Sequence, residues 1–111
     1  MSSFFQVVTT VESEEQARAL ARQMLEERLA GCVQISPCRS LYHWQGEIEE
    51  AGEYVCTLKT SDSLVQRLIS RLAAVHPYEV PEILALPVAD GHRPYLDWLD
   101  SELAPKSGTG T

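Results

Sequence analysis

Hydrophobic and polar positions at the start of the chain predict a strand followed by a helix. The run FFQVVTTV at 4–11 is rich in β-branched and aromatic residues, as in a buried strand. Ser13 with Gln16 three residues later is typical of a capping box, which predicts a helix start, and Gly31 predicts its end. The apolar positions at helical spacing are Ala17, Leu20, Ala21, Met24, Leu25 and Leu29.

The middle of the chain predicts two long strands. The first strand pattern begins at 32–35, is interrupted at Ser36-Pro37 and resumes at 39–50. The next strand is expected at 53–60. Within the second of these runs, alternation places Leu41 and His43 on one face and Tyr42 and Trp44 on the other.

Either Gln45-Gly46 or Ala51-Gly52 could reverse the chain between these strands. Arms of about 14 residues would reach about 45 Å, whereas the radius of gyration of such a domain is about 13 Å. The distal half of the hairpin should therefore leave the body of the fold, with a break or bulge allowed at Pro37.

The last third predicts a helix, a strand and a terminal helix. Ser61 or Asp62 should cap the second helix, which must end near His76 because a proline follows. The strand is expected at 83–88, and Pro94 suits the first position of the last helix. The apolar stripe of the second helix comprises Leu64, Val65, Leu68, Ile69 and Leu72.

The order of elements is β-α-β-β-α-β with an additional C-terminal helix. It predicts an α+β fold, a ferredoxin-like sandwich with a long central β-hairpin and both main helices on one face of an antiparallel sheet. We expect a single domain over 1–104 and a flexible tail over 105–111. The other face of the sheet would be bare, so something else should cover it.

Composition narrows the choice of partners. The 111 residues carry a formal net charge of -7, which disfavours nucleic acid and anionic membranes as partners. Neither a signal peptide nor a membrane span is recognisable in the sequence. The cysteines Cys32, Cys38 and Cys56 are odd in number and form no C-x-x-C pair, so we expect reduced thiols in a cytoplasmic protein.

No motif for catalysis is evident. The sequence has no Gly-rich phosphate loop and no H-E-x-x-H pair, and its histidines His43, His76 and His92 are far apart. We therefore expect a protein that is not an enzyme, with no catalytic residues and no required cofactor. The carboxylates Glu47, Glu49, Glu50 and Glu53 could attract a hard cation, although a solvated hairpin face is the simpler interpretation.

The segment HPYEVPE at 76–82 has the most specific chemistry. Residues that precede a proline are biased towards extended backbone, so this turn loses little entropy when it binds a ligand. His76 could ligate a metal, and Tyr78, Glu79 and Glu82 are candidates for lining a ligand cleft, together with Trp44 of the hairpin. The two prolines could also serve only to steer the chain from helix to strand.

Five segments of the chain form a recognisable pattern. They are ALARQMLEERLAGCVQI (19–35), SLYHWQGEIEE (40–50), LKTSDS (58–63), HPYEVPEILALPV (76–88) and YLDWL (95–99). Together they resemble the CutA family, the divalent-cation tolerance proteins. The resemblance runs from about Phe5 to Leu103 and implies a ferredoxin-like fold, a tight homotrimer similar in architecture to PII signalling proteins, and a cytoplasmic role connected with copper and other divalent metals.

The copper site that the resemblance implies is incomplete in this chain. Family members credited with copper binding use a cysteine near the end of the first strand and two adjacent histidines before Pro-Tyr. Thr9 and the pair Val75-His76 occupy these positions, so His76 alone is left as a ligand and any copper binding should be weak.

Two classes of function follow. The first is a trimeric, PII-like regulatory protein that binds a metal or small molecule in clefts between subunits. The second is a structural or interaction module whose stable trimer is the functional unit. In either case Trp44 should lie near a subunit boundary, because an exposed apolar hairpin with open edges would aggregate unless a neighbour paired with it.

Overall fold

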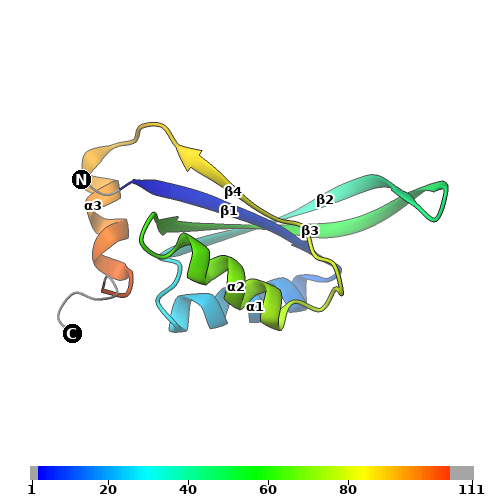
Figure 1. The fold of residues 1–111 in the computed structure, drawn as a ribbon, viewed down its shortest axis with the longest axis horizontal. Coiled ribbons are helices and arrows are strands. Elements are labelled where there is room, and N and C mark those ends of the chain that lie inside the picture. Colours follow the sequence, from blue (N-terminus) through cyan, green and yellow to red (C-terminus); the bar gives the residue numbers. More distant parts are fainter. Residues whose placement is uncertain (1–2, 106–111) are drawn as a thin grey trace.

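The computed structural model describes residues 3–105, and the part of the predicted tail from residue 106 onward lies outside them. The observed order of elements confirms the predicted α+β fold (Figure 1). The elements are β1 (Phe4–Val11), α1 (Glu14–Glu26), β2 (Cys32–Trp44), β3 (Glu47–Ser61), α2 (Val65–Val75), β4 (Ile83–Val88) and α3 (Arg93–Glu102).

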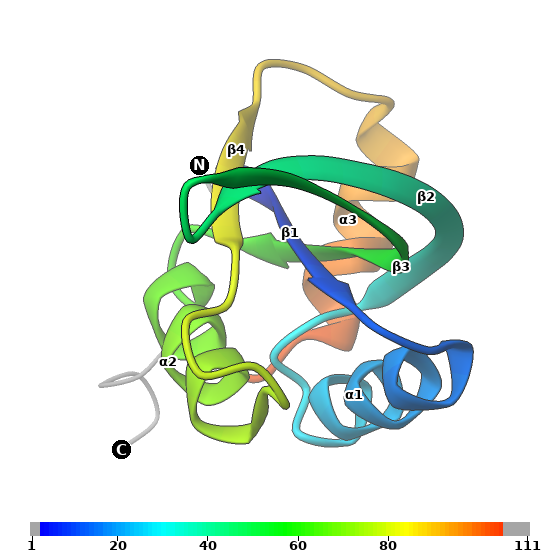
Figure 2. The same cartoon turned by 90° about the vertical axis from the view of Figure 1, so that its right-hand side faces the viewer.

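The four strands form one antiparallel sheet in the order β2-β3-β1-β4. Helices α1 and α2 lie side by side over one face of this sheet, and α3 packs at one end (Figures 1 and 2). Val7 and Leu58 pair across β1 and β3 and are fully buried beneath the helices. Leu84 and Leu86 of β4 point to the opposite face and are about half exposed, which confirms the predicted bare face.

Helix α1 begins as predicted. The hydroxyl of Ser13 accepts a hydrogen bond from the N–H of Gln16 at 3.1 Å. The side chain of Gln16 accepts in return from the N–H of Glu12, also at 3.1 Å, one residue earlier than in the usual box.

The end of α1 differs from the prediction. The helix stops at Glu26, and Arg28 takes the left-handed conformation with φ 60°. The N–H of Arg28 bonds Leu25 O and that of Leu29 bonds Met24 O, both at 3.0 Å, which is a Schellman motif. The prediction was wrong because an arginine occupies the position at which glycine is usual.

Gly31 has a different function from the predicted one. A Cβ added at this residue would lie 2.6 Å from Cδ1 of the buried Leu99. Gly31 therefore leaves room for Leu99 of α3 beside the start of β2, and it does not end α1.

The hairpin of β2 and β3 is continuous. Its register runs without interruption from Cys32 opposite Lys59 to Trp44 opposite Glu47, so the break or bulge allowed at Pro37 does not occur. An edge strand tolerates proline because its outward N–H would have no ladder partner.

The turn of the hairpin is at Gln45-Gly46, where φ is 51° and 82°, as in a two-residue type I′ turn. The last pair between β3 and β1 joins Tyr54 to Val11, so residues 47–53 pair with β2 alone. The hairpin therefore protrudes from the body, as predicted, and the molecule is 50 Å long (Figure 1).

Helix α2 lacks the predicted side-chain cap. Its N-cap is Leu64, and the hydroxyl of Ser61 instead lies 3.0 Å from that of Ser63. Leu64 holds this position because its side chain is fully buried in the core. At the other end, His76 is extended with ψ 140°, which confirms that the helix ends before the proline.

A two-point ion pair joins the C-terminal part of α1 to α2. Arg71 Nε and Nη2 each donate to a carboxylate oxygen of Glu27 at 2.8 Å. The hydrogen bond from Arg71 is the main reason that the pKa of Glu27 falls from 4.5 to about 2. The ionised form of Glu27 is therefore favoured by folding.

We expect this pair to contribute stability above about pH 4.5 and to lose that contribution as the pH falls towards about 2. Melting temperatures of the parent and of Glu27→Gln should differ at pH 6 and converge near pH 2. Glu26→Gln, a change at the exposed neighbouring residue, is the control and should follow the parent. A constant difference between parent and Glu27→Gln across this range would contradict the assignment.

Candidate functional site

The segment 76–82 connects α2 to β4 and lies beside the base of the hairpin (Figure 1). The structure brings His76 and Tyr78 together, with ring centroids 5.0 Å apart. Residues from β1 and β3 complete the contacts of these two side chains.

Both ring nitrogens of His76 are engaged. Nδ1 accepts from the N–H of Tyr78 at 3.1 Å, so the ring proton is on Nε2. Nε2 donates to the hydroxyl of Thr9 at 2.9 Å, and that hydroxyl donates to the carbonyl oxygen of Glu82 at 2.6 Å. These bonds connect the end of α2 to β1 and to the start of β4.

The electrostatics of His76 favour the neutral ring. Burial lowers the pKa of His76, and the backbone of Thr10 and the nearby carboxylate of Glu53 oppose this shift only in part. Thr9 is fully buried and its proton is committed to a carbonyl group, so its hydroxyl is not placed for nucleophilic attack.

Tyr78 reaches from the turn to the hairpin. Its hydroxyl donates to Oε2 of Glu53 at 2.7 Å. Burial, followed by the contact with Glu53, raises the pKa of Tyr78, so the hydroxyl stays protonated and remains a donor.

The other predicted site residues are placed differently. The side chains of Glu79 and Glu82 are exposed, and Glu82 takes part through its main-chain carbonyl. Trp44 is at the hairpin tip and 59% exposed. Its cross-strand partner Glu47 is six residues from Glu53, about 20 Å along the strand, so one chain does not bring Trp44 to the turn.

The described residues hold no group of three or more His, Cys, Asp or Glu side chains arranged for a metal ion. A cavity of about 410 Å³ at the hairpin base is lined by other residues, and the predicted cleft is not formed by these side chains within one chain. The residues lining this cavity are Glu14, Arg18, Ile35, Pro37 and Tyr54.

Sequence reasoning missed two partners in this site. From the sequence, Thr9 is recognisable only as a poor metal ligand, whereas its hydroxyl accepts a hydrogen bond from His76 and donates one to the main-chain carbonyl of Glu82. Glu53 was considered only as one of several hairpin carboxylates. Nothing in the sequence relates Glu53 to Tyr78, because the two lie 25 residues apart and are brought together only by the packing of the turn 76–82 beside the hairpin.

Apolar side chains are exposed on the hairpin and on the bare face of the sheet. In addition to Leu84 and Leu86 on the bare face, four apolar side chains of the hairpin are exposed, and within residues 3–105 the strands β2 and β4 have free edges. Exposed apolar ribbons with free edges are typical of interaction sites. The four hairpin residues are Leu41, Tyr42, Trp44 and Ile48.

The fold and the site define a ferredoxin-like α+β protein with a protruding hairpin. Residues 5–102 match the family model described as CutA1 divalent ion tolerance protein, and the chain belongs to this family. No helix within residues 3–105 has the length and apolar character needed to cross a membrane.

Curated relatives and solved structures agree with this assignment. The divalent-cation tolerance protein CutA of Thermus thermophilus is 52% identical over 94 residues, which are 84% of this chain and 91% of the relative. The protein CutA of Mus musculus is 44% identical over 103 residues. These residues are 92% of this chain but only 58% of the mouse protein. A solved structure of the divalent cation tolerance protein (Cut A1) from Thermus thermophilus superposes with a TM-score of 0.85 and 48% identity, covering 94% of this chain and 100% of the other.

Proposed function

We propose that this chain is a cytoplasmic, non-enzymatic homotrimer that takes part in divalent-cation tolerance and binds a metal or small ligand in clefts between subunits, in a PII-like regulatory role. The observation that carries the proposal is the protruding hairpin, whose exposed apolar side chains and free edge need a partner. The family of the chain and the names of its relatives support the connection with divalent cations.

The geometry of His76 argues for weak metal binding. A metal bound to Nε2 would require the ring proton to be on Nδ1. Nδ1 could then no longer accept the hydrogen bond from the N–H of Tyr78. A metal on Nδ1 would displace that N–H directly. Either mode costs a hydrogen bond, so copper should bind weakly through this residue.

We therefore expect His76→Ala to abolish a weak, saturable binding of Cu(II) measured by calorimetry. Lowering the pH below about 6 should also weaken binding, because protons compete for the imidazole. His92→Ala, at an exposed histidine, is the control and should bind as the parent does. Equal binding by His76→Ala and parent would exclude His76 as the ligand.

The second candidate function is a structural or interaction module whose trimer is the functional unit. The engaged nitrogens of His76 favour it, as does the finding that residues 3–105 contain no cluster of three ligating side chains. Calorimetry with Cu(II), Zn(II) and a panel of anionic metabolites separates the two candidates. Saturable binding of one ligand per subunit supports the first candidate, and no binding of any of them supports the second.

A further inference from the structure

The protruding half of the hairpin, residues 38–53, has little support from the rest of the chain. Between the turn and Tyr54, strand β3 does not pair with β1, and the hairpin consists of two strands only. All of residues 41–50 are exposed. An isolated two-stranded ribbon is marginally stable, so packing within the chain does not fix the direction of this segment.

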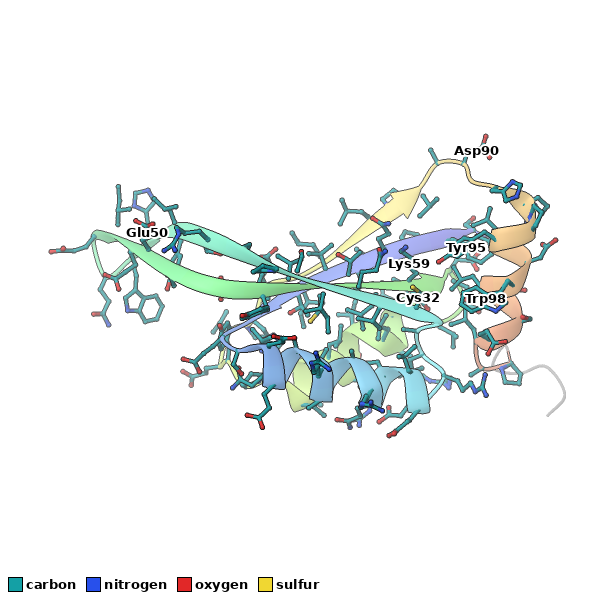
Figure 3. All side chains as sticks on the ribbon, turned by 180° about the vertical axis from the view of Figure 1, so that it is seen from behind. Cys32, Glu50, Lys59, Asp90, Tyr95 and Trp98 are labelled. Carbon is teal, nitrogen blue, oxygen red and sulfur yellow. The ribbon has the colours of Figure 1, made fainter. Side chains whose placement is uncertain are left out.

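One side-chain hydrogen bond joins the protruding half to the remainder of the described chain. Of the side-chain hydrogen bonds and ion pairs within residues 3–105, only that from Tyr78 to Glu53 does so. Arg39–Glu50 and Cys38–Ser40 lie inside the segment itself. Figure 3 shows Glu50 towards the far end of the hairpin, away from the body.

Glu53 is at the point where the hairpin leaves the sheet. Its neighbour Tyr54 forms the last pair with β1. A contact at this point, the root of the hairpin, acts on the whole protruding half, because a small rotation of the hairpin about its root moves the tip by a large distance. Glu53 is half-buried, as is Tyr78, so water competes only in part for their hydrogen bond.

Tyr78 is itself held in position. Its N–H donates a hydrogen bond to His76, and His76 donates one to the hydroxyl of Thr9. That hydroxyl donates in turn to the main-chain carbonyl of Glu82. Hydrogen bonds therefore run continuously from the residue before β4 to the root of the hairpin. Strand β1 and the end of α2 anchor this series, so Tyr78 is a firm point of attachment.

We propose that the Tyr78–Glu53 hydrogen bond is a tether that sets the direction of the hairpin and thereby controls how readily the chain assembles. The second part rests on the proposed homotrimer, because it is the hairpin that presents the apolar surface to a neighbour.

Hydrogen exchange tests the tether. In Tyr78→Phe, which removes only the hydroxyl, backbone amides of residues 47–53 should exchange roughly fivefold faster than in the parent. Tyr54→Phe is the matched control, since its hydroxyl makes no side-chain hydrogen bond within residues 3–105, and it should exchange as the parent does. Parent-like exchange in Tyr78→Phe, or an equal increase in both variants, would overturn the tether.

Glu53→Ala provides the reciprocal test. It should raise the rate of amide exchange in residues 47–53 by the same factor. The double variant Tyr78→Phe/Glu53→Ala should show no further increase, because the two side chains act through one hydrogen bond. Additive effects would show that they act independently and would overturn the proposal.

Light scattering on the same samples separates the tether from the trimer. If Tyr78→Phe were trimeric and its amides exchanged as in the parent, the tether would be rejected and the proposed trimer would still be supported. A monomeric parent would reject the trimer and the assembly clause, while faster exchange in Tyr78→Phe would still support the tether.

Discussion

Replacing Leu41 by glutamate should convert the proposed trimer into smaller species. Leu41 is 63% exposed in the single chain, on the part of the hairpin that is expected to lie against a neighbour. Burying an unpaired carboxylate there would cost several kcal/mol at each interface, and a ring of three repeats the cost three times. The mass measured by light scattering should fall towards the 12.4 kDa of one chain.

Leu25→Glu is the matched control for this experiment. Leu25 is also an exposed leucine, but it is on α1, in the helical layer on the other side of the sheet from the bare face. This variant should keep the mass of the parent. Loss of assembly in both variants would point to a general effect of added charge, and an unchanged mass in Leu41→Glu would exclude the hairpin from the interface.

Replacing Thr9 by valine should destabilise the fold strongly. The change keeps the shape of the side chain but removes the hydroxyl acceptor of His76 Nε2–H and the donor that the carbonyl of Glu82 has in the parent. Thr9 is fully buried, so water does not readily replace the hydroxyl. We expect a loss of about 1–3 kcal/mol in the free energy of unfolding, seen as a fall of several degrees in melting temperature at fixed protein concentration.

Two variants check the origin of this effect. Thr10→Val makes the same change at the next residue of β1, whose side chain makes no hydrogen bond within residues 3–105, and should be nearly neutral. Thr9→Ser retains the hydroxyl and should recover part of the loss. If Thr9→Val were as stable as the parent, the hydrogen bonds around His76 would not support the turn.

Much of the fold could be predicted because local pattern and tertiary burial agree. The capping residues of α1 and the proline after His76 act within a few residues of sequence, and both predictions are confirmed. The end of α1 and the start of α2 were placed wrongly, because Arg28 adopts a conformation usual for glycine and the buried Leu64 serves as a cap. In both cases the position of a side chain in the folded protein overrides its local preference.

The candidate site was predicted less completely than the fold. The prolines of segment 76–82 drew attention to His76 and Tyr78, and the structure brings these two side chains together. Their partners Thr9 and Glu53 are 67 and 25 residues away in sequence, and only the packing of the turn against β1 and β3 brings them close. The predicted position of Trp44 at a subunit boundary stays a prediction, because it concerns a neighbouring chain.

The central claim is that the hairpin and the bare face of the sheet are covered by copies of the same chain. Size exclusion coupled to light scattering, in metal-free buffer at low micromolar concentration, tests it most directly. We expect a single species of three 12.4 kDa chains, about 37 kDa. A mass near 12.4 kDa under these conditions would contradict the account.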